Sequence, residues 1–140
     1  MIKLNPYLNF NGNAEEAFNF YKSVFGVEFT SFQRFSDIPS DVPNPGIDEG
    51  SKIMHVSLSV GSNVLMGSDV PSKFPPISTG NNFNISLDTE SREEADRYFK
   101  ALSDGGQVTM PLEKTFWGAY FGMLTDKFGT QWMLNCETGE

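Results

Sequence analysis

Apolar and polar positions along this chain follow the same helical pattern twice. Each copy places four apolar side chains at the i, i+3, i+4 and i+7 spacing of one helix face: Ala14, Ala17, Phe18 and Tyr21 in the first, and Ala95, Tyr98, Phe99 and Leu102 in the second. Both begin with a capping-box pattern, Asn13 with Glu16 and Ser91 with Glu94. Two similar amphipathic helices are therefore expected, each inside its own supersecondary unit.

Period-2 alternation predicts strands around both helices. The clearest runs from Lys52 to Val60, with Met54, Val56 and Leu58 on one face and His55, Ser57 and Ser59 on the other. The other expected strands are Lys3–Phe10, Val27–Phe35 and Asn63–Gly67 in the first unit, and Phe83–Asp88, Gln107–Met110, Phe116–Leu124 and Thr130–Asn135 in the second. The order predicts an α+β protein of two tandem βαβββ units.

Proline-rich segments separate these elements. Ser36–Ser51 is expected to be a loop that could act as a lid, and Pro111–Thr115 is its shorter counterpart. We expect a single domain over residues 1–140, with unit one at about 1–69, a connector at 70–81 and unit two at about 82–136.

Composition narrows the possible partners and the cellular location. The net charge of −8 with no basic run argues against nucleic acid and anionic membranes as partners. The sequence has no apolar run near the roughly 20 residues that a spanning helix needs. Its one cysteine, Cys136, cannot form an intrachain disulfide, and its small apolar side chain is better suited to the core than to nucleophilic catalysis. A cytoplasmic protein is expected.

Several motifs identify a family resemblance that covers most of the chain outside the proline-rich loops. The segment from Pro6 to Gly26, IMHVSL at Ile53–Leu58, LMGSD at Leu65–Asp69 and the segment from Thr115 to Asn135 resemble the PhnB-like branch of the vicinal oxygen chelate superfamily. That superfamily includes glyoxalases, dioxygenases and bleomycin resistance proteins. The resemblance implies a curved mixed sheet around a cavity, two helices outside it, and a homodimer.

The resemblance also locates the positions where metal-dependent relatives hold a divalent ion. They fall on Asn82 and Met133 in the second unit, and on Leu65 with Leu4 or Pro6 in the first. None is His, Asp or Glu, so no metal is expected. Members of this branch often carry a ubiquinone-pathway methyltransferase label, yet Asn11-Gly12-Asn13 lacks the glycines of a nucleotide-binding loop. No cofactor is expected.

Candidate site residues come from the polar faces of the expected strands and from aromatic positions. His55 is the natural general base, or else a structural histidine. Asp69 could orient His55 or cap a turn. We expect His55 to lie within reach of Asp69 or of the segment 82–86. The expected ligand-binding residues are Ser57, Asn82, Asn84, Ser86, Trp117, Tyr120, Gln131 and Met133, whereas Trp132 is assigned to the core.

These residues favour a metal-independent protein that binds or sequesters a small, neutral or weakly polar molecule. A second hypothesis is an enzyme of the same fold, an isomerase, lyase or dioxygenase-like protein that uses His55 or an unusual metal site. A third is a structural dimer whose cavity is filled by its own aromatic side chains. A methyltransferase mechanism is not favoured.

Overall fold

The computed structural model describes residues 2–137, and the chain forms two compact units that divide after Ser78. This division lies inside the segment 70–81 that was expected to connect the units. In the described residues each unit contains one α-helix and four strands, in the order strand, α-helix and three strands, and the first unit adds two short 3-10 helices, Phe35–Asp37 and Ile47–Glu49, between its second and third strands. The α+β class and the two tandem βαβββ units are therefore as predicted.

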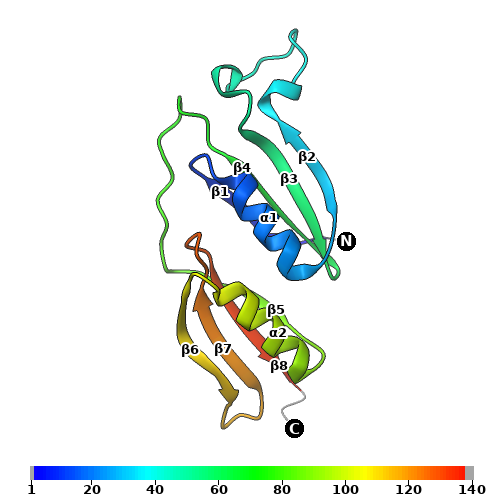
Figure 1. The fold of residues 1–140 in the computed structure, drawn as a ribbon, viewed down its shortest axis with the longest axis vertical. Coiled ribbons are helices and arrows are strands. Elements are labelled where there is room, and N and C mark those ends of the chain that lie inside the picture. The colour runs from blue at the N-terminus through cyan, green and yellow to red at the C-terminus, as the bar shows by residue number, and fades with distance from the viewer. Residues whose placement is uncertain (1, 138–140) are drawn as a thin grey trace. The chain divides into compact units, whose positions relative to one another are not determined.

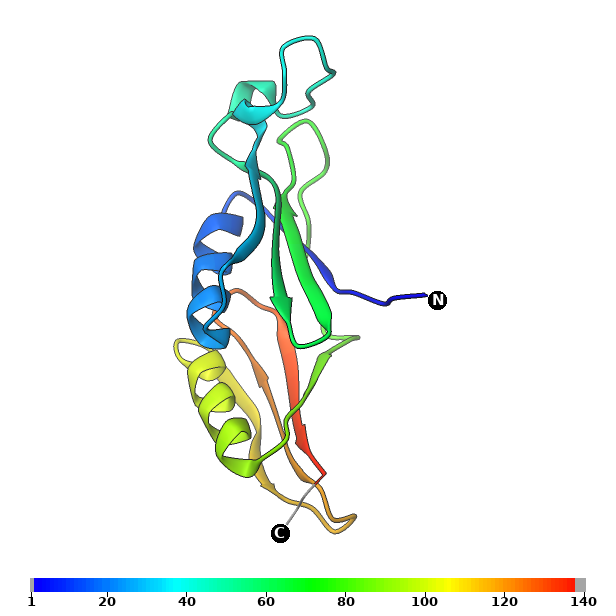
Figure 2. The ribbon, with the colours of Figure 1, turned by 90° about the vertical axis from the view of Figure 1, so that its right-hand side faces the viewer.

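The first unit is a four-stranded mixed sheet with a helix on one face (Figures 1 and 2). Its elements are β1 (Tyr7–Phe10), α1 (Ala14–Phe25), β2 (Phe29–Arg34), β3 (Ile53–Val60) and β4 (Asn63–Asp69). The strand order is β1-β4-β3-β2, with β1 parallel to β4 and the other neighbours antiparallel. The sheet is open, and its second face carries no helix of this unit.

The second unit repeats this topology. Its elements are β5 (Ile85–Asp88), α2 (Arg92–Ser103), β6 (Gln107–Lys114), β7 (Tyr120–Thr125) and β8 (Gln131–Cys136). The strand order is β5-β8-β7-β6, with β5 parallel to β8. This sheet does not close on itself either, and α2 packs on one of its faces. In each unit we call the face that packs against the helix the covered face, and the opposite one the open face. The enclosed cavity implied by the family resemblance stays a prediction.

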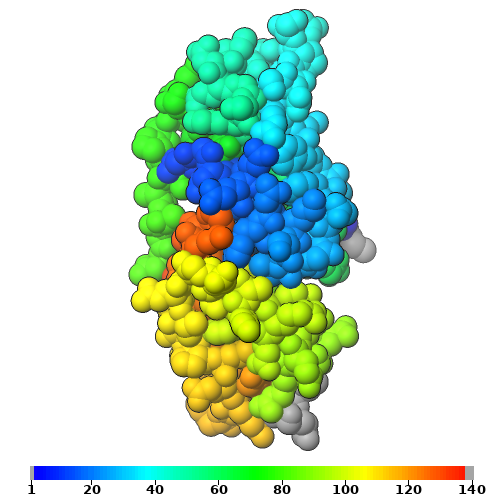
Figure 3. Space-filling view, viewed as in Figure 1, coloured from blue at the N-terminus to red at the C-terminus, as the bar shows by residue number. Residues whose placement is uncertain are grey.

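The core of each unit lies between its helix and its sheet. The apolar stripe of α1 is fully buried, as are Val56 and Leu58 on β3. In the second unit Ala95 and Leu102 of α2 are fully buried, together with Trp132, Leu134 and Cys136 on β8. In the space-filling view of Figure 3 the atoms of α1 and α2 lie in front of the sheets, while those of β2, β6 and β7 are visible beside them. The sequence assigned Trp132 and Cys136 to the core, and both are buried.

Two segments of the second unit differ from the prediction. β6 continues through Pro111 to Lys114, where a loop was expected. Proline is compatible with this strand because β6 lies at the edge of the sheet, where no neighbouring strand needs its missing N–H. The predicted strand from Phe116 instead begins at Tyr120, because residues 116–119 form the turn between β6 and β7.

The helix starts also differ from each other. The Ser91 hydroxyl accepts a 3.1 Å hydrogen bond from the Glu94 N–H, as its capping-box pattern predicts. The Glu94 carboxylate, however, accepts from the N–H of Glu90 rather than from that of Ser91. Asn13 makes no side-chain cap at the start of α1, so the predicted capping box is wrong there. No helix in the described part of the chain is long and apolar enough to cross a membrane.

Candidate functional site

The alternation of β3 and β4 decides which side chains reach the open face of the first sheet. Val56 is the partner of Gly67, and Leu58 is the partner of Leu65, so these residues share the face beneath α1. A Cβ atom at Gly67 would lie 2.6 Å from the Phe18 ring, which shows how closely the helix approaches there. The intervening positions, including His55 and Ser57, must therefore point to the open face.

His55 and Tyr7 meet on that open face. Gln33 is the strand partner of His55, while Ser31, Ser57, Met66 and Tyr7 form the adjacent row across the four strands. The Tyr7 hydroxyl lies 3.4 Å from His55 Nδ1, and the two rings are 5.8 Å apart between centroids with a tilt of 35°. The tautomer of His55 decides which group donates in this contact. The Tyr7 hydroxyl and the His55 imidazole can hydrogen-bond to each other, and each can also hydrogen-bond to a ligand.

We call this surface the histidine face. The strand positions on it are Tyr7, Asn9, Ser31, Gln33, His55, Ser57, Ser59, Val64, Met66 and Ser68, and none of these is an acidic residue, a lysine or an arginine. Ser57 is buried and His55 is half-buried. Hydroxyl, amide and imidazole groups on a partly buried surface can hydrogen-bond a polar molecule.

Asp69 does not accompany His55. It is buried and lies on the covered side of the sheet, two and four residues beyond Gly67 and Leu65. Its Oδ1 accepts from the N–H groups of Gly12 (3.0 Å) and Ala14 (2.9 Å), and its Oδ2 accepts from the Ile53 N–H at 2.9 Å. Asp69 thus holds the start of α1 and the start of β3, and its expected role beside His55 is not what the geometry supports.

The position of Asp69 explains why Asn13 is dispensable as a cap. β1 runs parallel to β4 with Phe10 opposite Asp69, so the chain enters α1 directly beside this carboxylate. The first N–H groups of a helix lack intrahelical acceptors, and a buried carboxylate satisfies them well. Local sequence around Asn13 could not reveal this cap because the acceptor comes from a distant strand.

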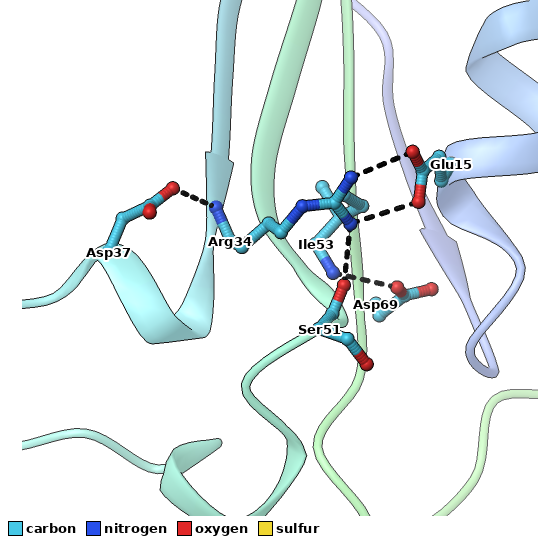
Figure 4. A network of polar contacts seen from close by, with 6 residues as sticks. All are labelled: Glu15, Arg34, Asp37, Ser51, Ile53 and Asp69. Atoms are coloured by element: carbon cyan, nitrogen blue, oxygen red, sulfur yellow. Dashed lines mark hydrogen bonds and ion pairs between the residues drawn. The ribbon is translucent and has the colours of Figure 1, made fainter.

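A second polar network ties the end of β2 to α1, as Figure 4 shows. The Arg34 guanidinium donates to both carboxylate oxygens of Glu15, at 2.9 and 2.8 Å, and to the Ser51 carbonyl at 2.7 Å. The hydrogen bonds from Arg34 lower the pKa of Glu15, and those to Glu15 raise the pKa of Arg34. The sequence pattern did not single out Arg34, because the hydrogen-bond acceptors of its guanidinium, Glu15 and Ser51, are both distant along the chain.

The loop between β2 and β3 is anchored at this end of the unit. Phe35 is buried, its carbonyl accepts a 2.9 Å hydrogen bond from Asn44 Nδ2, and Gly46 lies so close to its ring that a Cβ would clash at 2.5 Å. Glu49 forms an ion pair with Lys52 and accepts two hydrogen bonds from Ser72. These interactions lower the pKa of Glu49 to about 2. The role of this loop as a lid stays a prediction.

The open face of the second sheet receives some of the expected ligand-binding residues. Ser86 is the partner of Met133, and Gln131 is the partner of Thr125, on the face away from α2. Trp117 lies in the β6–β7 turn, is 58% exposed, and contacts the Phe121 ring edge-on. Asn82 and Asn84 precede β5, outside its paired residues.

Tyr120 points to the other side of this sheet. It is the partner of the buried Cys136, its hydroxyl donates to Asp96 Oδ1 of α2 at 2.5 Å, and the Arg92 guanidinium lies 4.3 Å from its ring centroid. The hydrogen bond with Asp96 raises the pKa of Tyr120. The expectation that Tyr120 lines the same pocket as Ser86 and Met133 is therefore wrong. Because β7 begins at Tyr120 and not at Phe116, the prediction placed the Tyr120 side chain on the wrong face of the sheet.

The donor atoms of the described residues do not fit the divalent metal of the superfamily. Within residues 2–137, no three His, Cys, Asp or Glu side chains are grouped closely enough to hold a metal ion. Leu65, one of the positions expected from the resemblance, is buried on the covered face. Met133 offers only a thioether, which hard cations bind poorly.

A family model and similar solved structures identify the same family for this chain. Residues 2–135 match the family described as 3-demethylubiquinone-9 3-methyltransferase. The crystal structure of protein PA1353 from Pseudomonas aeruginosa is similar, with 44% identity, a TM-score of 0.85 and 98% of both chains covered.

Two further solved structures extend the comparison. The PhnB protein from Bacillus cereus shares 30% identity at a TM-score of 0.73, over 96% of this chain and 99% of its own. A glyoxalase/bleomycin resistance protein/dioxygenase family enzyme from Burkholderia phytofirmans shares the fold alone, with 20% identity, a TM-score of 0.58, and 93% and 95% coverage.

Proposed function

Because the chain belongs to the 3-demethylubiquinone-9 3-methyltransferase family, the PhnB-like branch of the vicinal oxygen chelate superfamily, we propose that it binds a small uncharged polar molecule on the histidine face. One observation carries the proposal: Tyr7 and His55 meet on an open sheet face whose strand positions include no acidic residue, lysine or arginine. In this proposal binding uses hydrogen bonds and no metal ion.

The chemistry of the histidine face supports an uncharged ligand. A charged ligand would need an opposite charge to compensate for the loss of its hydration, and the face offers none. Hydroxyl and amide groups can donate and accept, so they satisfy carbonyl, hydroxyl or amide groups of a ligand. His55 adds a donor and an acceptor in one ring, and Tyr7 adds an aromatic wall beside it.

The proposal includes no methyl transfer, although the family name describes one. Methyl transfer needs a bound methyl donor, which nucleotide-binding proteins commonly hold on a glycine-rich turn between a strand and a helix. The corresponding turn between β1 and α1 contains Asn11, Gly12 and Asn13. In place of a ligand, Asp69 accepts the Gly12 N–H and the first N–H of α1.

A second candidate function is proton-transfer catalysis at the same place. The contact between Tyr7 and His55 favours it, because an imidazole can act as a general base while a neighbouring phenol hydroxyl passes the proton on. An isomerisation next to a carbonyl group is a suitable reaction class. Binding without turnover and binding with turnover differ in whether the ligand is recovered unchanged. NMR spectroscopy of the incubated ligand decides this, because it distinguishes isomers of equal mass.

A thermal-shift screen of uncharged metabolites tests the proposed function. A hit should raise the melting temperature of the wild-type protein, and His55→Ala should weaken its affinity about tenfold, the loss of one good hydrogen bond. Asn19→Ala, at an exposed position of α1, is the matched control and should bind normally. Equal affinities of His55→Ala and wild type for every hit would reject the proposed site.

Metal analysis of protein purified without chelator tests metal independence. We expect no stoichiometric divalent ion, and we expect ligand affinity to be unchanged by EDTA. A stoichiometric ion that is lost together with ligand binding would overturn this part of the proposal and favour an enzyme with a non-standard metal site.

We also propose that the protein is a homodimer, as the family resemblance implies, and that it is cytoplasmic, as its composition and single cysteine favour. Light scattering of the purified protein should then give twice the mass of 15.6 kDa for one chain. A monomer at micromolar concentration would contradict the dimer. Fractionation of cells that express the native gene would test the location.

A further inference from the structure

The open face of the second sheet is aromatic and thioether-rich at its centre. Met110, Met123 and Met133 are successive strand partners across β6, β7 and β8. Phe121 lies two residues before Met123 on β7 and therefore on the same face. Trp117 contacts the Phe121 ring at 6.1 Å between centroids. We call this surface, with the Phe116–Trp117 turn, the aromatic face.

Carboxylates occupy the next row of the aromatic face. Glu113 is the partner of Phe121, Phe121 of Asn135, and Asn135 of Asp88. Asn135 Nδ2 donates to Asp88 at 3.2 Å and to Glu137 at 3.1 Å, so one amide brings two carboxylates together. Among the described residues that strand register and these bonds place here, the charged side chains are all acidic.

The turn that carries the aromatic rings is fixed by its own hydrogen bonds. The backbone N–H and the hydroxyl of Thr115 both donate to the Ala119 carbonyl at 2.8 Å. Gly118 adopts a φ of 98°, which closes the turn with little strain because glycine has no Cβ. Phe116 is 97% exposed and packs edge-on against Trp117 at 5.0 Å. A ligand would therefore meet two rings carried by a turn whose backbone is fixed.

We propose that the aromatic face binds a planar organic cation. Aromatic rings present a negative π face to a cation, thioether sulfur packs well against flat rings, and Asp88, Glu113 and Glu137 supply the opposite charge. The net charge of −8 further raises the local concentration of cations. This inference concerns a different surface from the histidine face and stands whether or not that face binds a ligand.

The size of the exposed rings favours a small molecule over a second protein. Two aromatic side chains bury about 150–250 Å² each when they are covered. A stable protein interface needs about 800 Å² from each partner. Phe116 and Trp117 alone supply too little area for such an interface, but enough to cover one face of a ligand with two or three fused rings.

Calorimetry with three acridines tests the inference, because they share a ring system and differ in charge. At neutral pH proflavine is a cation, acridine is uncharged and acridine-9-carboxylate is an anion. We expect proflavine to bind about tenfold or more tighter than acridine, and the carboxylate to bind most weakly. Spermidine, a cation without rings, should bind much more weakly than proflavine. Equal affinities for the three acridines, or for spermidine and proflavine, would reject the inference.

Matched variants locate the binding. Trp117→Ala and Glu113→Gln should each weaken proflavine binding about threefold to tenfold. Phe74→Ala, which removes another half-exposed ring, and Glu93→Gln, which removes an exposed acid on α2, should leave the affinity unchanged. If the controls weaken binding as much as the test variants, the dye associates through net charge alone and the proposed site is wrong. Circular dichroism confirms that each variant is folded.

Discussion

The open faces of the two sheets have opposite chemistry although the two units share one topology. The histidine face has hydroxyl and amide groups around Tyr7 and His55, without fixed charge. The aromatic face has rings and thioethers beside three carboxylates. The covered faces, in contrast, are both mainly apolar. The two βαβββ units therefore share their core pattern, whereas their open faces are free to differ because no packing within the unit constrains them.

Buried aspartates show a similar contrast between the units. Asp69 accepts three backbone N–H groups and fastens α1 and β3 in the first unit. Asp126 in the second accepts from the N–H groups of Phe128 and Thr130 and from the Trp132 indole, so it fastens the β7–β8 turn. In both residues the carboxylate oxygens accept hydrogen bonds that hold the fold together, which favours a structural role over a catalytic one.

The largest expected effect comes from Asp69→Ala. It would leave three N–H groups without an acceptor, two of them buried, and we expect a loss of about 3 to 5 kcal/mol in the free energy of unfolding. Urea denaturation measures this loss. Any fully folded variant should bind ligands on the histidine face normally. Normal stability combined with lost binding would instead identify Asp69 as a site residue and contradict its structural role.

Gly67→Ala should have the next largest effect. The new methyl group would lie 2.6 Å from the Phe18 ring and 2.8 Å from the Leu8 carbonyl oxygen, so α1 must shift. Overpacking of this kind costs about 1 to 3 kcal/mol. Gly61→Ala, in the open β3–β4 turn, is a useful comparison for strain without crowding. An unfolding midpoint equal to that of wild type would mean that the helix does not approach β4 so closely.

His55→Ala should affect binding more than stability. The residue is half-buried and its contact with Tyr7 is a long one, so we expect the unfolding free energy to change by less than about 1 kcal/mol. Affinity for an uncharged ligand should fall about tenfold. A loss of about 1 to 3 kcal/mol in stability with unchanged affinity would identify a strand-pairing histidine instead.

Acid should weaken the first unit through Glu49 and Glu15. Both carboxylates have a pKa lowered in the folded state, Glu49 to about 2, so their stabilising contribution is complete above the unfolded pKa of about 4.3. This contribution is lost as the pH falls from there toward 2. Glu49→Gln should show a smaller loss of melting temperature over this range than wild type. Parallel curves for the two proteins would contradict the proposed link between Glu49 and acid stability.

Prediction from sequence succeeded for the elements that pack one face against the core, because that packing produces a regular pattern of hydrophobic and polar residues. The helices and β3 have clear periodicity because one side of each packs against the core. Prediction failed where a distant residue decides, since Asp69 and not Asn13 accepts the first N–H groups of α1. It also failed at Pro111, because proline usually interrupts a strand but is tolerated in an edge strand such as β6.

Side-chain direction was the hardest property of the site to predict. His55 and Ser57 were assigned correctly to the open face because β3 alternates without interruption. Tyr120 was misassigned because it begins its strand after a turn, and sequence gives no phase across a turn. Tyr7 was not recognised as the neighbour of His55, since that contact depends on the register of β1 with β4.

The most direct test of the central claim, that the two open faces bind different classes of ligand, is an NMR titration of isotope-labelled protein. An uncharged hit from the thermal-shift screen should shift the amide signals of Tyr7, His55 and Ser57 and leave those of Trp117 and Phe121 in place. Proflavine should do the reverse. If both ligands shift the same set of signals, or if neither shifts residues on the histidine face, the claim is contradicted.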